Sequence, residues 1–206
     1  MIDRRTLLKQ LGLMASGALI LPACDFNPRK VSVALDNLKI TVEQEDLLKI
    51  LVDTIIPKGE FLGAKELEVD KFVWVMADDC LKKEQQDIFL AGLSRFNAYF
   101  ESKNEKSFDK VEPNERVSFL TETMQLEAPE PPPLPKKEPK EESKEPPVDN
   151  YLKYIQQFVN TVKSFTIQGY LQSEYIMREI MPYALVPGKI EYCQTIDPTK
   201  RVNING

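Results

Sequence analysis

Residues 151–181 read YLKYIQQFVNTVKSFTIQGYLQSEYIMREIM, and their apolar side chains recur every three or four positions. This spacing places the side chains on one face of an α-helix, because a helix turns once in about 3.6 residues. The stretch therefore predicts a long amphipathic helix that packs on other helices. Its apolar stripe consists of Tyr151, Ile155, Phe158, Val159, Val162 and Phe165.

The same period occurs in earlier segments of the chain. Thr41, followed by Gln44, has the spacing of a capping box, and the apolar helix that it opens is expected to end before Pro57. Because apolar residues recur with the helical period of 3.6 in most of these segments, the predicted fold class is all-α, a single helical bundle domain. Further helices are expected over residues 69–80, 83–97 and 113–126.

Residues 127–148 interrupt this pattern with the sequence EAPEPPPLPKKEPKEESKEPPV. They hold 8 of the 15 prolines and no aromatic residue, so they cannot pack a core, and a disordered Pro/Glu/Lys-rich insertion is expected. The alternative is a ligand for a proline-recognition domain. Because the helical period returns afterwards, residues 39–126 and 149–206 are expected to form one domain. Residues 182–206 would cross the bundle as an irregular strap.

The first 23 residues have the features of a signal peptide. Basic residues precede an uncharged run of 11 residues, Leu11–Leu21, whereas a membrane-spanning helix needs roughly 20. The segment Leu21-Pro22-Ala23-Cys24 resembles the lipobox of bacterial lipoproteins, in which the peptide is cut before the cysteine and its thiol receives lipid. Cys24 is then the lipidation site, and residues 24–38 are a tether. The alternative is a cysteine buried in a short N-terminal helix.

Residues 3–9, DRRTLLK, resemble the twin-arginine export motif, with Arg4 and Arg5 as the paired arginines. That route carries proteins that are already folded. The alternative is an ordinary secretory lipoprotein whose basic region contains two adjacent arginines. In both cases the chain is expected to be exported to the periplasm or cell envelope and anchored to the membrane through its lipid.

The composition excludes several kinds of chemistry. The chain contains no histidine, which excludes Ser-His-Asp and Cys-His nucleophile systems and histidine-ligated zinc. None of its 8 glycines lies in a nucleotide-binding loop motif. We therefore expect no catalytic residue, no metal site and no cofactor in this chain. The net charge of −5 argues against a nucleic-acid partner.

Five further residues are candidates for bonding or contact. Cys80 and Cys193 are candidates for a disulfide, since exported proteins often contain them; the alternatives are two separate thiols or a bridge to a partner. Asp78 and Asp79 are interpreted as a solvated helix end or, alternatively, as a partner contact. Trp74 belongs to an aromatic stripe, which is more often core, although an exposed contact patch is the alternative.

Residues 47–80, LLKILVDTIIPKGEFLGAKELEVDKFVWVMADDC, resemble the opening of the gluconate 2-dehydrogenase subunit 3 family. The chain departs from the family pattern in the insertion at 127–148 and at Glu191-Tyr192-Cys193, where a glycine is expected before the cysteine. The matching motifs are Asp53-Thr54-Ile55-Ile56-Pro57, Gly63-Ala64-Lys65 and Val69, Asp78-Asp79-Cys80, Glu84-Gln85-Gln86 with Phe89 to Leu93, Gly169-Tyr170 with Ser173-Glu174, and Val186-Pro187-Gly188.

The resemblance implies a small, cofactor-free subunit of a membrane-associated, flavin-dependent sugar or sugar-acid dehydrogenase. The partner would be a large FAD-binding subunit of the glucose-methanol-choline class, often with a cytochrome c as electron acceptor. The small subunit would supply export, assembly and a membrane tether, and no chemistry. The alternatives are a stand-alone structural or binding lipoprotein of the cell envelope and, third, an enzyme in its own right.

Overall fold

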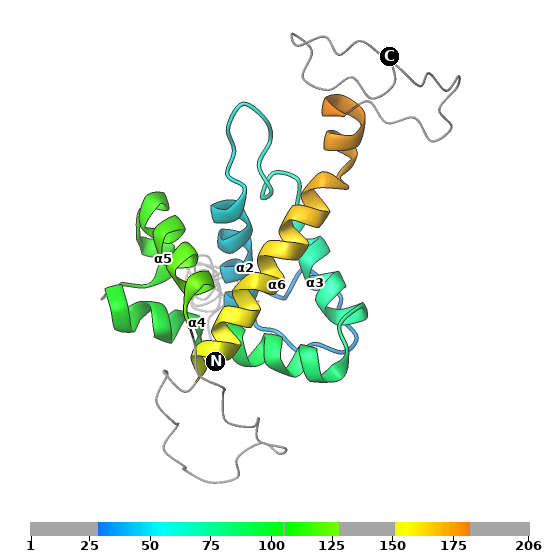
Figure 1. Ribbon diagram of the computed structural model, residues 1–206. Helices are drawn as coiled ribbons and strands as arrows, with labels where there is room; N and C mark the ends of the chain where they lie inside the picture. Colours follow the sequence, from blue (N-terminus) through cyan, green and yellow to red (C-terminus); the bar gives the residue numbers. More distant parts are fainter. Residues whose placement is uncertain (1–28, 105, 128–150, 182–206) are drawn as a thin grey trace, which may run out of the picture. The chain divides into compact units, whose positions relative to one another are not determined.

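The computed structural model describes residues 29–104, 106–127 and 151–181 (Figure 1). The chain divides into two compact units, 1–30 and 31–206, and the second contains every helix described below. The described residues form helices, turns and loops and no strand, so the predicted all-α class is confirmed. The predicted signal peptide, the strap and nearly all of the insertion lie outside the described residues.

Helix α2 (Val42–Ile55) begins with the predicted capping box. The Gln44 N–H donates to Thr41 Oγ1 at 3.3 Å, and the Thr41 N–H donates to Gln44 Oε1 at 3.0 Å. The helix ends two residues before Pro57, as expected, because proline has no N–H to continue the ladder. Its buried apolar face consists of Leu47, Leu48, Leu51 and Val52.

The next helices follow the predicted order. Helix α3 (Val69–Asp79) and helix α5 (Pro113–Gln125) lie close to their expected bounds, and a 3-10 turn, η1 (Phe108–Lys110), precedes α5. Helix α4 (Lys83–Asn104) extends beyond the predicted end at residue 97. The extension carries Phe100, whose ring lies 4.7 Å from that of Phe119, so core packing continues the helix.

Helix α6 (Leu152–Leu171) contacts α2, α3, α4 and α5, and its most extensive contacts are with α4 (Figure 1, yellow helix). The prediction of one continuous helix to residue 181 is wrong. The Ser173 N–H and hydroxyl both donate to the Tyr170 carbonyl, and Ser173 Oγ accepts the Ile176 N–H. These local bonds replace the helical ladder, and a separate π-helical turn, η3 (Ile176–Ile180), follows.

A chain of aromatic rings joins these helices in one core. Trp74 of α3 lies edge-on to Phe89 of α4 with ring centroids 6.0 Å apart, and Phe89 lies 5.0 Å from Phe158 of α6. Phe96 lies 6.0 Å from Phe158 and 5.0 Å from Phe108 of η1. Edge-to-face pairs of this kind add about 0.5–1.5 kcal/mol each beyond their burial. The core therefore joins α6 to α3, α4 and η1, which follow one another in the chain before the insertion.

Candidate functional site

The carboxylate of Asp78, at the C-terminal end of α3, is only 4% exposed and accepts three consecutive backbone N–H groups. Asp36 donates to Oδ2 at 2.7 Å, and Asn37 and Leu38 donate to Oδ1 at 2.9 and 2.6 Å. Burial alone would raise the pKa of Asp78, but the three backbone bonds hold this pKa below its ordinary value. The ionised carboxylate thus fixes residues 36–38 to α3.

The backbone at this helix end is also bonded. Gln86 of α4 is buried, and its Nε2 donates to the Asp78 carbonyl at 2.6 Å and to the Ala77 carbonyl at 3.4 Å. Asn37 Nδ2 donates to the same Asp78 carbonyl at 3.2 Å. Carbonyls at the end of a helix lack partners within the helix, so these amides satisfy them. The network joins the segment before α2 to both α3 and α4.

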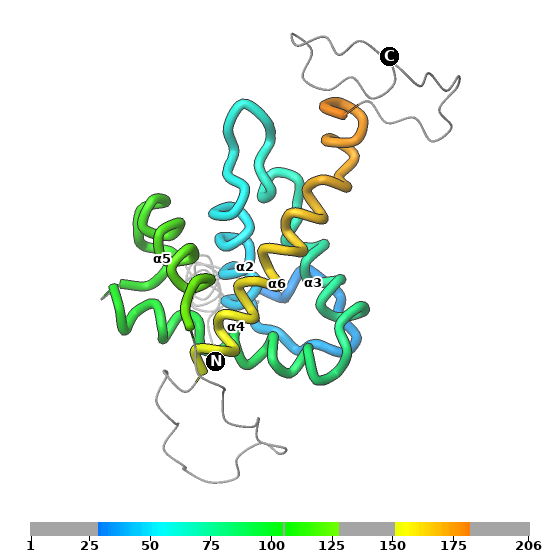
Figure 2. Tube along the Cα trace, viewed as in Figure 1, coloured from blue at the N-terminus to red at the C-terminus, as the bar shows by residue number. Residues whose placement is uncertain are grey.

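A second buried carboxylate, Glu45 of α2, holds the same segment at Ser32, four residues before Asp36. The Ser32 N–H donates to Glu45 Oε1 at 3.0 Å and to Oε2 at 3.2 Å, and the Ser32 hydroxyl also donates to Oε1. We call Glu45, Asp78 and residues 32–38 the carboxylate clamp; Figure 2 traces its segment in blue beside the end of α3. The tether predicted over residues 24–38 is therefore wrong for residues 32–38, which belong to the domain.

The structure corrects two of the predicted contact residues. Trp74 is 0% exposed and packs on Phe89, so the core alternative is confirmed and the hypothesis of an exposed patch is wrong for it. Asp78 is neither solvated nor available to a partner. A signal for Asp78 was present in the sequence, because the helix dipole disfavours an acid at a helix C-terminus unless other donors compensate. Asp79 is exposed, and its contact with a partner stays a prediction.

Other predicted residues fall outside the described part of the chain. Arg4, Arg5, Cys24 and Cys193 lie there, so export, lipidation and the disulfide stay predictions. Cys80 is exposed at the end of α3, with its Sγ 3.7 Å from Met76 Sδ.

Asp70, in the first turn of α3, is a further buried acid. Its burial raises the pKa of the carboxyl, although Lys49 opposes this shift. Among the described residues, its Oδ1 and the indole Nε1 of Trp74 are buried atoms without a hydrogen-bond partner. Asp70 and Trp74 lie one helical turn apart on the same face. The ionised form of Asp70 is thus disfavoured by the fold.

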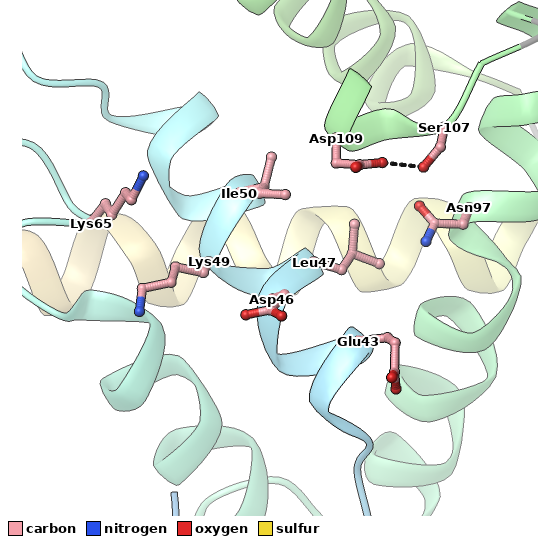
Figure 3. Close-up of a pocket in the computed structure, with 9 residues that line it drawn as sticks. All are labelled: Glu43, Asp46, Leu47, Lys49, Ile50, Lys65, Asn97, Ser107 and Asp109. Atoms are coloured by element: carbon pink, nitrogen blue, oxygen red, sulfur yellow. Dashed lines mark hydrogen bonds between the residues drawn. The ribbon is translucent and has the colours of Figure 1, made fainter. Parts of the chain in front are cut away.

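A groove of about 550 Å³ opens along α2 (Figure 3). Leu47 and Ile50 lie in its middle, and Lys49 and Lys65 project on one side of them. The Ser107 hydroxyl donates to Asp109 Oδ1, and this bond holds the pKa of Asp109 below its ordinary value. The lining therefore offers ion pairs and hydrogen bonds to a bound segment. It consists of Glu43, Asp46, Leu47, Lys49, Ile50, Lys65, Asn97, Ser107 and Asp109.

Neither a metal centre nor a membrane span is found in the part of the chain that the structure describes. No group of three or more Cys, Asp or Glu side chains is placed there to hold an ion. None of the described helices combines the length and apolar character needed to cross a bilayer.

The loop between α2 and α3 closes against the end of α6. The Ala64 N–H donates to the Ile56 carbonyl at 2.9 Å, and the Tyr170 hydroxyl donates to the Leu62 carbonyl at 2.9 Å. A Cβ at Gly63 would lie 2.5 Å from the backbone nitrogen of Lys58, so this position has room only for glycine. Two short motifs more than 100 residues apart in the sequence are thus held together.

A family model described as gluconate 2-dehydrogenase subunit 3 matches residues 42–188, well over half of the chain. The chain belongs to this family. Neither the curated proteins nor the solved structures contain a match to it. The resemblance seen in residues 47–80 is thereby confirmed.

Members of the gluconate 2-dehydrogenase subunit 3 family are small subunits of dehydrogenase complexes, so the family implies partnership with the other subunits of such a complex. The matched range begins at the first residue of α2 and includes α3 to α6. Within it, three of the motif residues have structural roles: Gly63 and Tyr170 close the loop, and Asp78 fixes the preceding segment.

Proposed function

We propose that this chain is the non-catalytic small subunit that exports, assembles and membrane-tethers a partner FAD-dependent dehydrogenase. The partner belongs to the glucose-methanol-choline class and acts on a sugar or sugar acid. The observation that carries the proposal is membership of the subunit 3 family in a chain whose front end, Arg4-Arg5, resembles a signal for folded cargo. The absence of histidine and of a nucleotide-binding loop from the sequence supports placing the FAD in the partner.

The carboxylate clamp supports the tethering role. Lipid at Cys24 is separated from the first clamped residue, Ser32, by eight residue steps, which span at most about 28 Å when fully extended. The helical domain, and a dehydrogenase bound to it, is then held close to the membrane that carries its electron acceptor, a cytochrome c in many such complexes.

The subunit role is tested by affinity purification of the full chain from detergent-solubilised native membranes. We expect a flavoprotein to accompany it in near-equal amount, recognised by the visible absorbance of oxidised flavin and by mass spectrometry. A colourless protein without a partner would refute the subunit role and favour the stand-alone lipoprotein.

The export role is tested by changing Arg4 and Arg5 together to lysine, which keeps the positive charge and removes the twin-arginine pair. We expect both this chain and its flavoprotein partner to remain in the cytoplasm. Arg29→Lys, outside the motif, is the matched control and should leave export unchanged. Normal export of the double variant would assign the chain to the ordinary secretory route.

The lipid anchor is tested by Cys24→Ala. We expect the chain and its partner to leave the membrane fraction while they stay bound to each other. Retention of the variant in washed membranes would show that lipid at Cys24 is not the anchor.

A further inference from the structure

One row of exposed side chains on α6 carries no charge over residues 157–171. Lys153 lies on the same face one turn before this row, and the exposed Lys163 borders it. The exposed side chains Gln157, Asn160, Ser164, Ile167 and Leu171 follow one another at three- and four-residue spacings, so they lie on one face. We call them the uncharged stripe; it is about 21 Å long at 1.5 Å per residue. The whole helix contains two lysines and no acid, in a chain of which 29% is charged.

The two ends of the stripe differ in shape. At one end Ile167 is 39% and Leu171 49% exposed, so two large apolar side chains protrude one turn apart. At the other end Gln157 and Asn160 border a hollow of about 340 Å³ between α6 and the start of α4. Phe89 lines that hollow, and none of its lining residues is charged. The groove along α2, in contrast, is lined by five charged side chains.

The uncharged stripe differs in two ways from the exposed row on α5 that is also uncharged. It carries two large apolar side chains, and it borders an uncharged hollow. The row on α5 consists of Asn114, Ser118, Thr121 and Gln125. The exposed sides of the neighbouring helices carry acids and bases, such as the pair Lys83 and Asp87 on α4, 3.1 Å apart, and the exposed Glu115 on α5. The buried centres of protein interfaces are depleted in charged residues, because a charge that loses its water without a counter-charge is costly. In a chain with a net charge of −5, the uncharged stripe is a surface that a partner covers without desolvating a carboxylate.

We infer that the uncharged stripe is the docking surface for the dehydrogenase subunit, which rests on the proposed function above. The partner surface that fits is itself uncharged. It places an apolar side chain in the hollow, offers hydrogen bonds to Gln157 and Asn160, and covers Ile167 and Leu171. A membrane surface fits less well, because Lys163 is the only exposed base on α6 and interfacial helices usually carry several.

The test is the double change Ile167→Lys with Leu171→Lys in the full chain, purified from native membranes with whatever flavoprotein it holds. Both positions are exposed and lysine is a good helix former, so the fold should be unaffected. Val117→Lys on α5 is the matched control, because Val117 is 47% exposed. We expect the recovered flavoprotein to fall by about tenfold or more in the double variant and to be unchanged in the control.

Each other outcome has a defined meaning. Undiminished recovery of flavoprotein by the double variant overturns the inference and leaves the proposed function standing. A lower melting temperature in the double variant alone also overturns it, because the stripe would then be covered by this chain itself. If the unchanged chain sediments as a dimer and the double variant as a monomer, the stripe joins two copies of this chain and the inference is overturned. If the double variant keeps its flavoprotein but no longer binds anionic vesicles, the stripe contacts membrane and the inference is also overturned. If the unchanged chain recovers no flavoprotein, the proposed function fails and the inference fails with it.

Discussion

Replacing Asp78 by alanine removes the one acceptor shared by the N–H groups of residues 36–38. A hydrogen bond to a charged group contributes about 1.5–3 kcal/mol, but three bonds to one carboxylate are not additive. The cost is limited by the free energy of releasing the segment into water, where its N–H groups are hydrated. Release also exposes the buried side chain of Leu38, worth about 2 kcal/mol.

These terms predict that Asp78→Ala lowers the free energy of unfolding by about 3–5 kcal/mol at neutral pH. For a domain of this size, a loss of 3 kcal/mol lowers the melting temperature by roughly 6–12 °C. The difference in unfolding free energy between wild type and Asp78→Ala is largest at neutral pH and shrinks in acid. The folded-state pKa of Asp78 lies below the ordinary value of 3.8, so its stabilisation is complete above that value and is lost as the pH falls through the folded-state pKa. Wild type and variant should therefore converge in acid.

The assay is urea unfolding followed by circular dichroism, with hydrogen exchange of the backbone amides of residues 36–38. Asp79→Ala is the matched control, because this neighbouring acid is exposed and should change stability by about 0.5 kcal/mol or less. Amide exchange should accelerate at residues 36–38 in Asp78→Ala alone. Equal stabilities of the two variants, with unchanged amide protection, would refute the clamp as a stabilising device.

Two further predictions concern buried positions. Asp70→Asn should not destabilise the protein at pH 7, because burial raises the folded-state pKa of Asp70; the wild type gains stability as the pH falls toward that pKa and the variant does not. Urea unfolding at pH 5 and 7 checks this, and a clear loss at pH 7 would contradict it. Gly92→Ala should cost about 2–3 kcal/mol, because its Cβ would lie 2.4 Å from the Tyr154 carbonyl oxygen. Gly169→Ala should lower stability less than Gly92→Ala, since its Cβ meets the movable ring of Phe72. A lower melting temperature for Gly169→Ala than for Gly92→Ala would exclude this explanation.

The elements that could be predicted are those whose causes lie within a few residues. The capping box at Thr41, the stop before Pro57 and the start of α5 at Pro113 depend on neighbours in the chain. The apolar period that predicts each helix is equally local. Where a tertiary contact decided the outcome, the prediction missed: α4 continues because Phe100 packs on Phe119.

The candidate site was predicted less well than the fold. Its central residue, Asp78, was named as a helix-end acid, yet its three donors lie about 40 residues earlier in a segment expected to be a tether. The pairing of Ser32 with Glu45 had no signal in the sequence at all. Carboxylates and backbone N–H groups occur throughout the chain. Only the folded structure shows that Asp78 bonds residues 36–38 and that Glu45 bonds Ser32.

The sequence by itself determined the helical class, the family and the residues from which export and lipidation are inferred, because periodicity and short motifs are properties of adjacent residues. Tertiary structure decided which acids are buried and bonded and which side chains of α6 are exposed. Burial and pairing depend on contacts between α2, α3, α4 and α6. A carboxylate such as Asp78 is solvated or structural according to which backbone N–H groups the fold places beside it.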